Sequence, residues 1–129
     1  MTTEEIQRLV SEAEEAGKRA VAPYSGFKVG AALMTRGGMI FTASNVENPS
    51  LMLTACAERI ALLNAVSSGQ TDIAAMAVVS EKGGPCFPCG SCRQALYEFA
   101  PDAAIYLKAK DGIKKFTLEE LLPYPFQKG

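Results

Sequence analysis

The four cysteines are the residues that most clearly indicate a chemical function. Cys86, Cys89 and Cys92 lie within a stretch of seven residues. Cys89 and Cys92 are three residues apart, so in the first turn of a helix their side chains point the same way. The chain has no histidine, which excludes Ser-His-Asp and Cys-His catalysis and any histidine-containing metal site. Clustered cysteines in a reducing compartment favour metal or redox chemistry over a structural disulfide.

Cys56 supplies a third thiol, since it precedes a predicted helix just as Cys89 does. The positive end of a helix favours thiolate over thiol. Three converging thiolates suit Zn²⁺, which prefers sulfur ligands in a tetrahedron. We therefore predict one zinc ion per subunit, held by Cys56, Cys89 and Cys92. Three protein ligands leave the fourth position to water, which is typical of a catalytic zinc.

Glu58 lies two residues after Cys56, and a carboxylate beside such a zinc could act as general acid and base. Two residues of helix correspond to a rotation of about 200°. The two side chains can therefore share a site only if Cys56 stands at the helix end. Three thiolates leave zinc with a net negative charge, which makes it a poor Lewis acid. We predict that Arg59 and Arg93 offset this charge through hydrogen bonds to the sulfurs; the alternative for both is a solvated helix face.

Hydrophobic periodicity predicts the elements that position these side chains. A capping box of Thr2 and Glu5 begins a helix that continues to about Ala20, and two strands flank Gly37-Gly38 within residues 27–46. Helices are predicted over 54–67, 89–99 and 117–123, and strands over 73–80, 103–110 and 112–116. This order predicts a single α/β domain over residues 1–129, a three-layer α-β-α sandwich with a mixed sheet of roughly five strands.

Composition narrows the possible partners. Thirteen basic residues against 14 acidic ones give a net charge of −1, which disfavours a nucleic-acid partner. No apolar run approaches the roughly 20 residues of a membrane span, and the acidic, amphipathic N-terminus is unlike a signal peptide. We therefore expect a cytoplasmic protein that binds neither nucleic acid nor membrane.

Five sequence fragments together resemble one known family. Cys56-Ala57-Glu58 and Pro88-Cys89-Gly90-Ser91-Cys92 match the pattern of zinc deaminases. The runs PYSGFKVGAAL (23–33), SNVEN (44–48) and LLPYPF (121–126) extend the likeness to the small homotetrameric cytidine deaminases, over most of the chain and in the family's order. The resemblance implies hydrolytic deamination of cytidine or 2′-deoxycytidine in pyrimidine salvage, with Glu58 moving the protons. It also implies a homotetramer with shared active sites.

The resemblance further implies a substrate-binding role at five matching positions. Phe27 would pack on the pyrimidine face, and Asn45 and Glu47 would bind the ribose hydroxyls. Ala57 would contact the base through its backbone, and Phe126 would close the pocket of a neighbouring subunit. Outside the family pattern, such residues would be assigned to the core, to turns or to a docked tail.

The sequence departs from the family at Leu51, which stands where the family usually has a tyrosine near the nucleoside. This change leaves the preferred nucleoside open, including the choice between ribose and deoxyribose. Deamination of another aminopyrimidine nucleoside, such as blasticidin S, is an alternative because that related family shares the zinc motifs.

Cys86 raises an alternative from a different class of protein. As a fourth zinc ligand it would close the site and make the protein a non-catalytic module stabilised by zinc on four cysteines; otherwise it is a free thiol near the site. A thiol-disulfide protein using Cys89 and Cys92 is a third reading, but it leaves Glu58 without a role.

Overall fold

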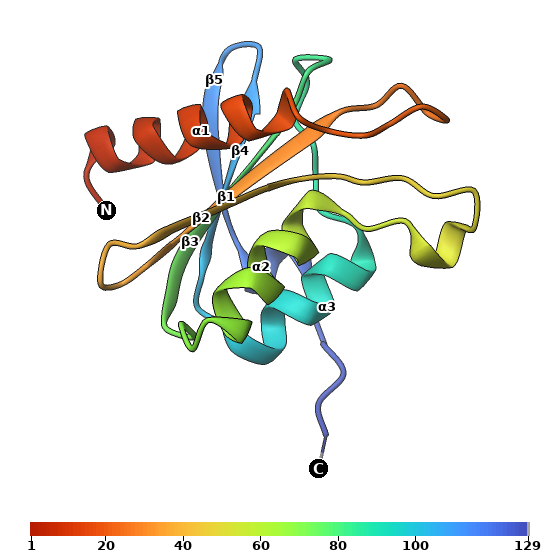
Figure 1. The fold of residues 1–129 in the computed structure, drawn as a ribbon. Coiled ribbons are helices and arrows are strands. Elements are labelled where there is room, and N and C mark those ends of the chain that lie inside the picture. The colour runs from red at the N-terminus through yellow and green to blue at the C-terminus, as the bar shows by residue number, and fades with distance from the viewer. Residues whose placement is uncertain (129) are drawn as a thin grey trace.

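A mixed sheet runs through the middle of the protein, and its five strands lie in the order β2-β1-β3-β4-β5 (Figure 1). The computed structural model describes residues 1–128. The strands are β1 (Val29–Thr35), β2 (Ile40–Ser44), β3 (Ile73–Ser80), β4 (Ala104–Ala109) and β5 (Gly112–Thr117). β1 is antiparallel to both β2 and β3, β3 is parallel to β4, and β4 is antiparallel to β5.

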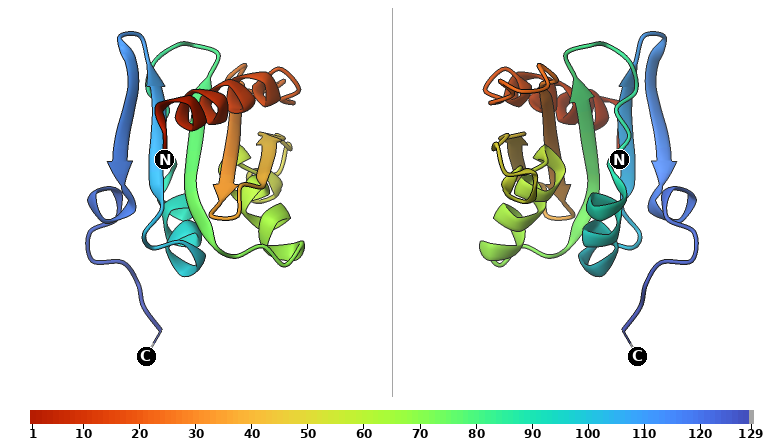
Figure 2. Two further views of the ribbon diagram at one scale, coloured as in Figure 1. Left: turned by 90° about the vertical axis from the view of Figure 1, so that its left-hand side faces the viewer. Right: turned by 90° about the vertical axis from the view of Figure 1, so that its right-hand side faces the viewer.

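Helices cover both faces of this sheet. α1 (Thr3–Gly17) lies on one face, while α2 (Ala57–Ser67) and α3 (Gly90–Phe99) lie side by side on the other (Figures 1 and 2). A short 3-10 helix, η1 (Leu51–Leu53), precedes α2, and α4 (Leu118–Leu121) follows β5. The predicted three-layer arrangement is therefore confirmed.

Strand β1 contributes side chains to two hydrophobic cores, one on each face of the sheet, because successive side chains of a strand point to opposite faces. Ala31 and Leu33 pack with α2 and α3, whereas Ala32 and Met34 pack with α1. Every residue of β1 is buried, as expected of a strand covered on both faces.

Glycine at position 30 permits α1 to approach β1 closely. A Cβ atom on Gly30 would lie 1.8 Å from the carbonyl oxygen of Ala13 and 2.5 Å from the nitrogen of Gly17. The start of α1 has the predicted capping box, in which Glu5 N donates to Thr2 Oγ1 and Thr2 N donates to Glu5 Oε1. The cap and this contact fix where α1 crosses the sheet.

Two predicted helix boundaries are wrong. α1 ends at Gly17 rather than near Ala20. α2 begins at Ala57 rather than Thr54, because Ala55 pairs in extended conformation with Val46 through hydrogen bonds of 2.9 and 3.0 Å. Helix η1, which the sequence did not predict, occupies the preceding residues. Within residues 1–128, no helix combines the length and hydrophobicity needed to cross a bilayer.

Candidate active site

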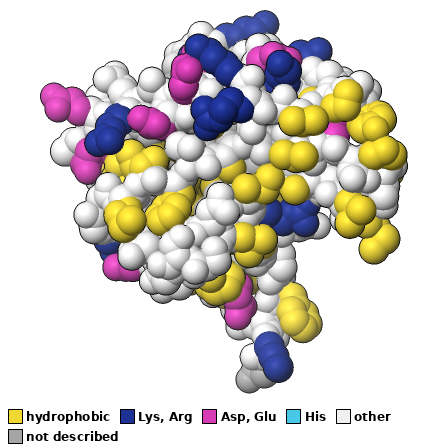
Figure 3. All heavy atoms as spheres, viewed as in Figure 1, with side chains coloured by type: hydrophobic (Ala, Val, Ile, Leu, Met, Phe, Trp, Pro, Cys, Tyr) yellow, Lys and Arg dark blue, Asp and Glu magenta, His cyan; other side chains and the backbone are white. Residues whose placement is uncertain are grey.

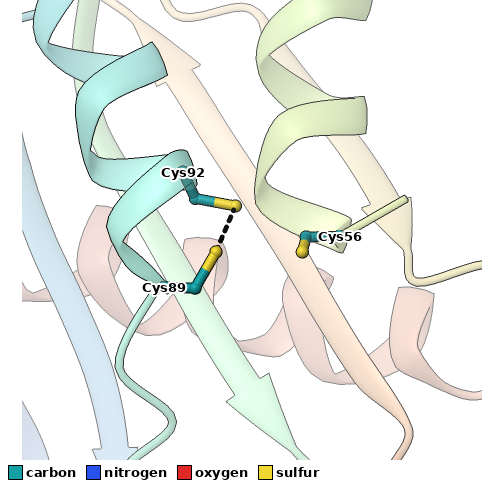
Figure 4. Close-up of side chains that lie close together, drawn as sticks. All are labelled: Cys56, Cys89 and Cys92. Carbon is teal, nitrogen blue, oxygen red and sulfur yellow. Dashed lines mark hydrogen bonds between the residues drawn. The ribbon is translucent and has the colours of Figure 1, made fainter. Parts of the chain in front are cut away.

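Three cysteines from two helices converge at one point. Cys56 is the N-cap of α2 and Cys89 the N-cap of α3, while Cys92 lies buried in the first turn of α3. Their Sγ atoms all lie within 4.8 Å of one another, and the Cys89 and Cys92 sulfurs are 3.5 Å apart. Figure 4 shows the three side chains pointing toward a common centre. The geometric condition on Cys56 is met, because its backbone is extended (φ −77°, ψ 145°) and it stands at the helix end.

This arrangement fits a zinc ion. Zinc–sulfur bonds of about 2.3 Å in a tetrahedron place sulfur atoms about 3.8 Å apart, which agrees with the spacing of the three thiols. Both N-cap cysteines stand at the positive end of a helix, which stabilises bound thiolate. Three ligands from the described chain leave one coordination position to a non-protein group.

The protonation of the thiols is set mainly by burial. Burial raises the pKa of Cys56 and of Cys92. Burial acts on Cys89 in the same direction, but hydrogen bonds that include the backbone N–H groups of Cys92 and Ser91 hold the pKa of that thiol below its usual value. A metal must therefore displace protons from Cys56 and Cys92, whereas Cys89 becomes a thiolate more readily.

Glu58 lies in the first turn of α2 and is only 5% exposed. Burial raises the pKa of its carboxyl group, although contact with the Cys92 thiol and the charge of Arg59 act in the opposite direction. A raised pKa suits a group that must both accept and return a proton near neutral pH. Glu58 is the one buried carboxylate of the described residues.

The two arginines make different contacts. Arg59 Nη2 donates to Cys56 Sγ over 3.7 Å and to the carbonyl of Thr54 over 3.3 Å. Arg93 does not have the predicted contact with a thiol among the hydrogen bonds of residues 1–128. It donates instead to the carbonyl oxygens of Pro88 (2.7 Å) and Leu121 (2.6 Å), so it braces the loop before Cys89 against the end of α4.

Cys86 lies outside the thiol cluster. In the part of the chain that the structure describes, the group that could hold a metal consists of Cys56, Cys89 and Cys92. Cys86 is half-buried against the core on the α2 and α3 side, and burial raises its pKa to about 11. Its environment is that of an unreactive thiol, and the geometry does not favour a closed four-cysteine site.

Asn45 and Glu47 hold the loop that precedes β1. Asn45 accepts from Val29 N and donates to the carbonyl of Phe27, both at 2.9 Å. Glu47 accepts from Tyr24 N (2.9 Å) and Ser25 N (3.1 Å), and also from the Ser25 hydroxyl. These bonds lower the pKa of Glu47. Both side chains can form further hydrogen bonds, since the Asn45 amide has a second N–H and the Glu47 carboxylate has about one further lone pair.

The backbone brings this loop next to the thiols. Val46 forms bridges with Val21 on one side and Ala55 on the other, so Asn45 and Glu47 run beside the residues that lead into Cys56. Leu51 and Glu47 both line a cavity of about 360 Å³ on this side of the protein. Asn45 and Glu47 therefore lie on the segment that pairs with the residue before Cys56.

The remaining predicted contact residues differ in exposure. Ala57 is fully buried, Phe27 is 38% exposed and Phe126 is 76% exposed. Sequence reasoning missed Ser25, whose hydroxyl joins Glu47 to Phe27 N, and Gln94, which holds the main chain of Phe126. Ser25 lies in a fragment already singled out, but a contact across 32 residues, as at Gln94, has no local signal.

A three-layer fold with three thiols at the start of two helices, beside a buried carboxylate, defines a zinc-binding α/β protein of the deaminase type. Residues 3–108 match the family described as "Cytidine and deoxycytidylate deaminase zinc-binding region". The chain therefore belongs to this family, and the family, fold and zinc predicted from the motifs are confirmed.

Individual relatives agree with this assignment. A cytidine deaminase of Halalkalibacterium halodurans is 46% identical over 122 residues, covering 93% of this chain and 92% of the relative. The crystal structure of cytidine deaminase from Burkholderia pseudomallei superposes with a TM-score of 0.89 at 42% identity, over 98% of this chain and 100% of the other. A blasticidin-S deaminase of Bacillus cereus is 34% identical over 106 residues, or 76% of each chain.

Proposed function

We propose that this protein is a hydrolase that converts cytidine and 2′-deoxycytidine to uridine and 2′-deoxyuridine with release of ammonia, in pyrimidine salvage. The observation that carries the proposal is the buried carboxylate of Glu58 in the same helical turn that follows Cys56, beside three converging thiols. The similarity to relatives that are named cytidine deaminases over more than nine-tenths of the chain supports this choice of substrate.

We assign the residues the following roles on the basis of their positions. Cys56, Cys89 and Cys92 hold the zinc ion, which, when bound, supplies a Lewis acid that lowers the pKa of water at its open position. Glu58 would take a proton from the attacking water and pass it to N3 of the pyrimidine as the water oxygen bonds to C4. It would then take the proton of the new C4 hydroxyl group and deliver it to the amino nitrogen, whose bond to C4 breaks. Water and cytidine are thus consumed, and uridine and ammonia are formed. Arg59 offsets the charge of the thiolates through its contact with Cys56.

Substrate orientation falls to the loop beside the thiols. Asn45 and Glu47 bind the ribose hydroxyls with the donor and acceptor that the loop leaves free, and Phe27 packs against the pyrimidine ring. Ala57 contributes a backbone contact to the base. The half-exposed ring of Phe27 and its fixed main chain support this assignment.

A direct test uses zinc-loaded protein with cytidine and deoxycytidine, following ultraviolet absorbance and released ammonia. Glu58→Gln keeps the shape of the side chain but cannot take up the proton, so turnover should fall by about 100-fold or more while zinc content is unchanged. Equal turnover in the variant would refute the role of Glu58. Turnover of blasticidin S without turnover of cytidine or deoxycytidine would instead support the alternative substrate. The similarity to the blasticidin-S deaminase of Bacillus cereus is the reason to include this compound in the assay.

We also infer that the protein acts as a homotetramer with shared active sites. Leu51, Met52 and Leu53 of η1 are 87%, 95% and 68% exposed, and Figure 3 shows hydrophobic side chains gathered on this side of the molecule. Phe126 is also exposed, on the C-terminal tail. Exposed apolar clusters of this kind mark contact surfaces. Equilibrium sedimentation should give four times the chain mass, and a monomer at assay concentrations would refute the inference.

Residues 1–129 are proposed to act as one domain in the cytoplasm. The single sheet with a core on each face supports one cooperative unit. The four cysteines are free and three are proposed zinc ligands, which supports a compartment in which thiols stay reduced.

A further inference from the structure

The C-terminal tail, residues 122–128, is fastened to the same helix that carries two of the metal ligands. Gln94 Nε2 donates to the carbonyl of Phe126 over 3.0 Å, and Phe126 N donates to Gln94 Oε1 over 3.2 Å. One turn further along α3, the Tyr97 hydroxyl bonds to the side chain of Gln127. The tail thus lies against α3 through polar contacts with two successive turns.

Apolar burial contributes little to the position of the tail. Tyr124 is fully exposed and Phe126 is 76% exposed, and in Figures 1 and 2 the end of the tail projects beyond the helices. Pro123 and Pro125 restrict the backbone on either side of Tyr124. The two prolines therefore stiffen this segment, and polar contacts with Gln94 and Tyr97 hold its far end.

The near end of the tail is held by the neighbouring residue of α3. Arg93 donates to the carbonyl of Leu121, the last residue of α4, and also to the carbonyl of Pro88. Pro88 directly precedes the metal ligand Cys89. Arg93 and Gln94 together therefore connect the tail to the metal-binding turn.

We propose that Gln94 is a positioning residue that fixes the C-terminal tail on α3 and thereby sets where the Phe126 ring is presented. The inference rests on the proposed function, a deaminase tetramer with shared active sites, and on the role that the family resemblance implies for Phe126, which is to close the nucleoside pocket of a neighbouring subunit. The new element is that Gln94 orients the Phe126 ring. Gln94 touches neither substrate nor metal in this role, and it acts through the main chain of Phe126.

A primary amide suits this role because it offers a donor and an acceptor on one planar group. It pairs with both main-chain groups of Phe126, much as a neighbouring strand would. Glutamate at this position would keep the acceptor for Phe126 N but would set a carboxylate oxygen against the Phe126 carbonyl. Methionine would keep the length of the side chain and lose both hydrogen bonds.

The expected consequence is a change in KM without a matching change in kcat. Loss of two hydrogen bonds should raise KM for cytidine by about five- to fiftyfold in Gln94→Met and Gln94→Glu. The rate constant kcat should stay within about twofold, because the metal ligands and Glu58 are untouched. Zinc content should equal that of the wild type. Gln7→Met, on the exposed side of α1, is the matched control and should change none of these values.

A double-mutant comparison separates this role from a general structural one. If Gln94 acts through Phe126, Gln94→Met should add little to the KM of Phe126→Ala. If the two changes multiply instead, Gln94 acts by another route and the proposal is overturned.

Hydrogen exchange of the Phe126 amide provides a readout that does not depend on activity. This amide donates to Gln94, so its exchange should accelerate at least about fivefold in Gln94→Met while amides of the core strands keep their rates. Unchanged exchange would overturn the proposal even if KM rose. If wild-type protein deaminates no cytidine, the proposed function fails, and the exchange measurement still decides whether Gln94 fixes the tail.

Discussion

Replacing Arg59 with glutamine is expected to weaken zinc binding about ten- to thirtyfold. The guanidinium donates to Cys56 Sγ over 3.7 Å and shares the same Nη2 with the carbonyl of Thr54. Burial raises the pKa of Cys56, and the hydrogen bond from Arg59 is among the contributions that lower it. The substitution removes that contribution and leaves the thiolate less stable.

The magnitude follows from the geometry of this one contact. A hydrogen bond to a charged group contributes about 1.5 to 3 kcal/mol, and changes behind a metal ligand typically cost about 10- to 100-fold in affinity. Because the Arg59 donor is shared with Thr54 O, we take the lower part of the affinity range, about ten- to thirtyfold, which corresponds to about 1.4 to 2 kcal/mol. Arg59→Lys, which keeps the charge but not the forked geometry, should fall between the wild type and Arg59→Gln.

A competition titration against a chromophoric zinc chelator measures this affinity. Zinc must displace protons from Cys56 and Cys92, whose pKa values are raised, so affinity should fall as pH decreases from about 8 to 6. Loss of Arg59 raises the pKa of Cys56 further, which moves the whole affinity curve toward higher pH. Arg36→Gln is the matched control, because Arg36 pairs with the exposed Asp72.

Two results would refute this reasoning. Zinc affinity in Arg59→Gln could equal that of the wild type across the pH range, which would mean that the Cys56 contact has no effect on the metal. Alternatively, Arg36→Gln could lose as much affinity as Arg59→Gln. The loss would then reflect the change in net charge rather than the hydrogen bond.

Three further predictions concern packing, protonation and substrate preference. Gly30→Ala should lower the free energy of unfolding in urea by about 3 kcal/mol or more, because the new Cβ would lie 1.8 Å from Ala13 O. In the control, Gly84→Ala, the new Cβ meets nothing within 4 Å, so the free energy of unfolding should change by less than about 0.5 kcal/mol. Equal losses in the two variants would contradict the argument from close approach. Burial raises the pKa of Glu58, so in chelator-treated protein the folded state binds more protons than the unfolded chain above the ordinary pKa of glutamate. The free energy of unfolding should therefore fall as pH rises from the ordinary glutamate pKa through the raised pKa of Glu58. Thermal unfolding between about pH 4 and 8 should show this decline in the wild type and a flatter curve in Glu58→Gln, and parallel curves would refute it. Leu51→Tyr restores a hydroxyl beside the cavity lined by Glu47 and should lower KM for cytidine about three- to tenfold with kcat unchanged; an altered kcat with constant KM would count against a binding role.

Local signals predicted most of the secondary structure because they act within a few residues. The capping boxes at Thr2 and Thr117 begin α1 and α4 as expected, and Cys89 is the N-cap of α3. A cap depends on a side chain and a backbone N–H that are three residues apart, so the sequence is sufficient to find it. The start of α2 was misplaced because the extended backbone at Ala55 comes from pairing with Val46, which no local pattern reports.

The metal ligands could also be predicted from the sequence, because two of them are close together along the chain. The spacing of Cys89 and Cys92 and the absence of histidine point to sulfur ligands. The positions of the arginines were harder to predict. Arg59 lies three residues from Cys56 and contacts it, whereas Arg93 contacts Leu121, 28 residues away.

The amino-acid sequence by itself determined the ligand types, the acid two residues after Cys56, the order of the main helices and strands, and the family. These properties depend on side-chain chemistry and short-range periodicity. Tertiary structure decided that Cys56 faces Cys89 and Cys92, that Asn45 and Glu47 brace the loop before β1, and that α3 holds the tail. Such contacts form only when the sheet brings distant segments together, because their hydrogen-bond partners are set by packing across the fold rather than by spacing along the chain.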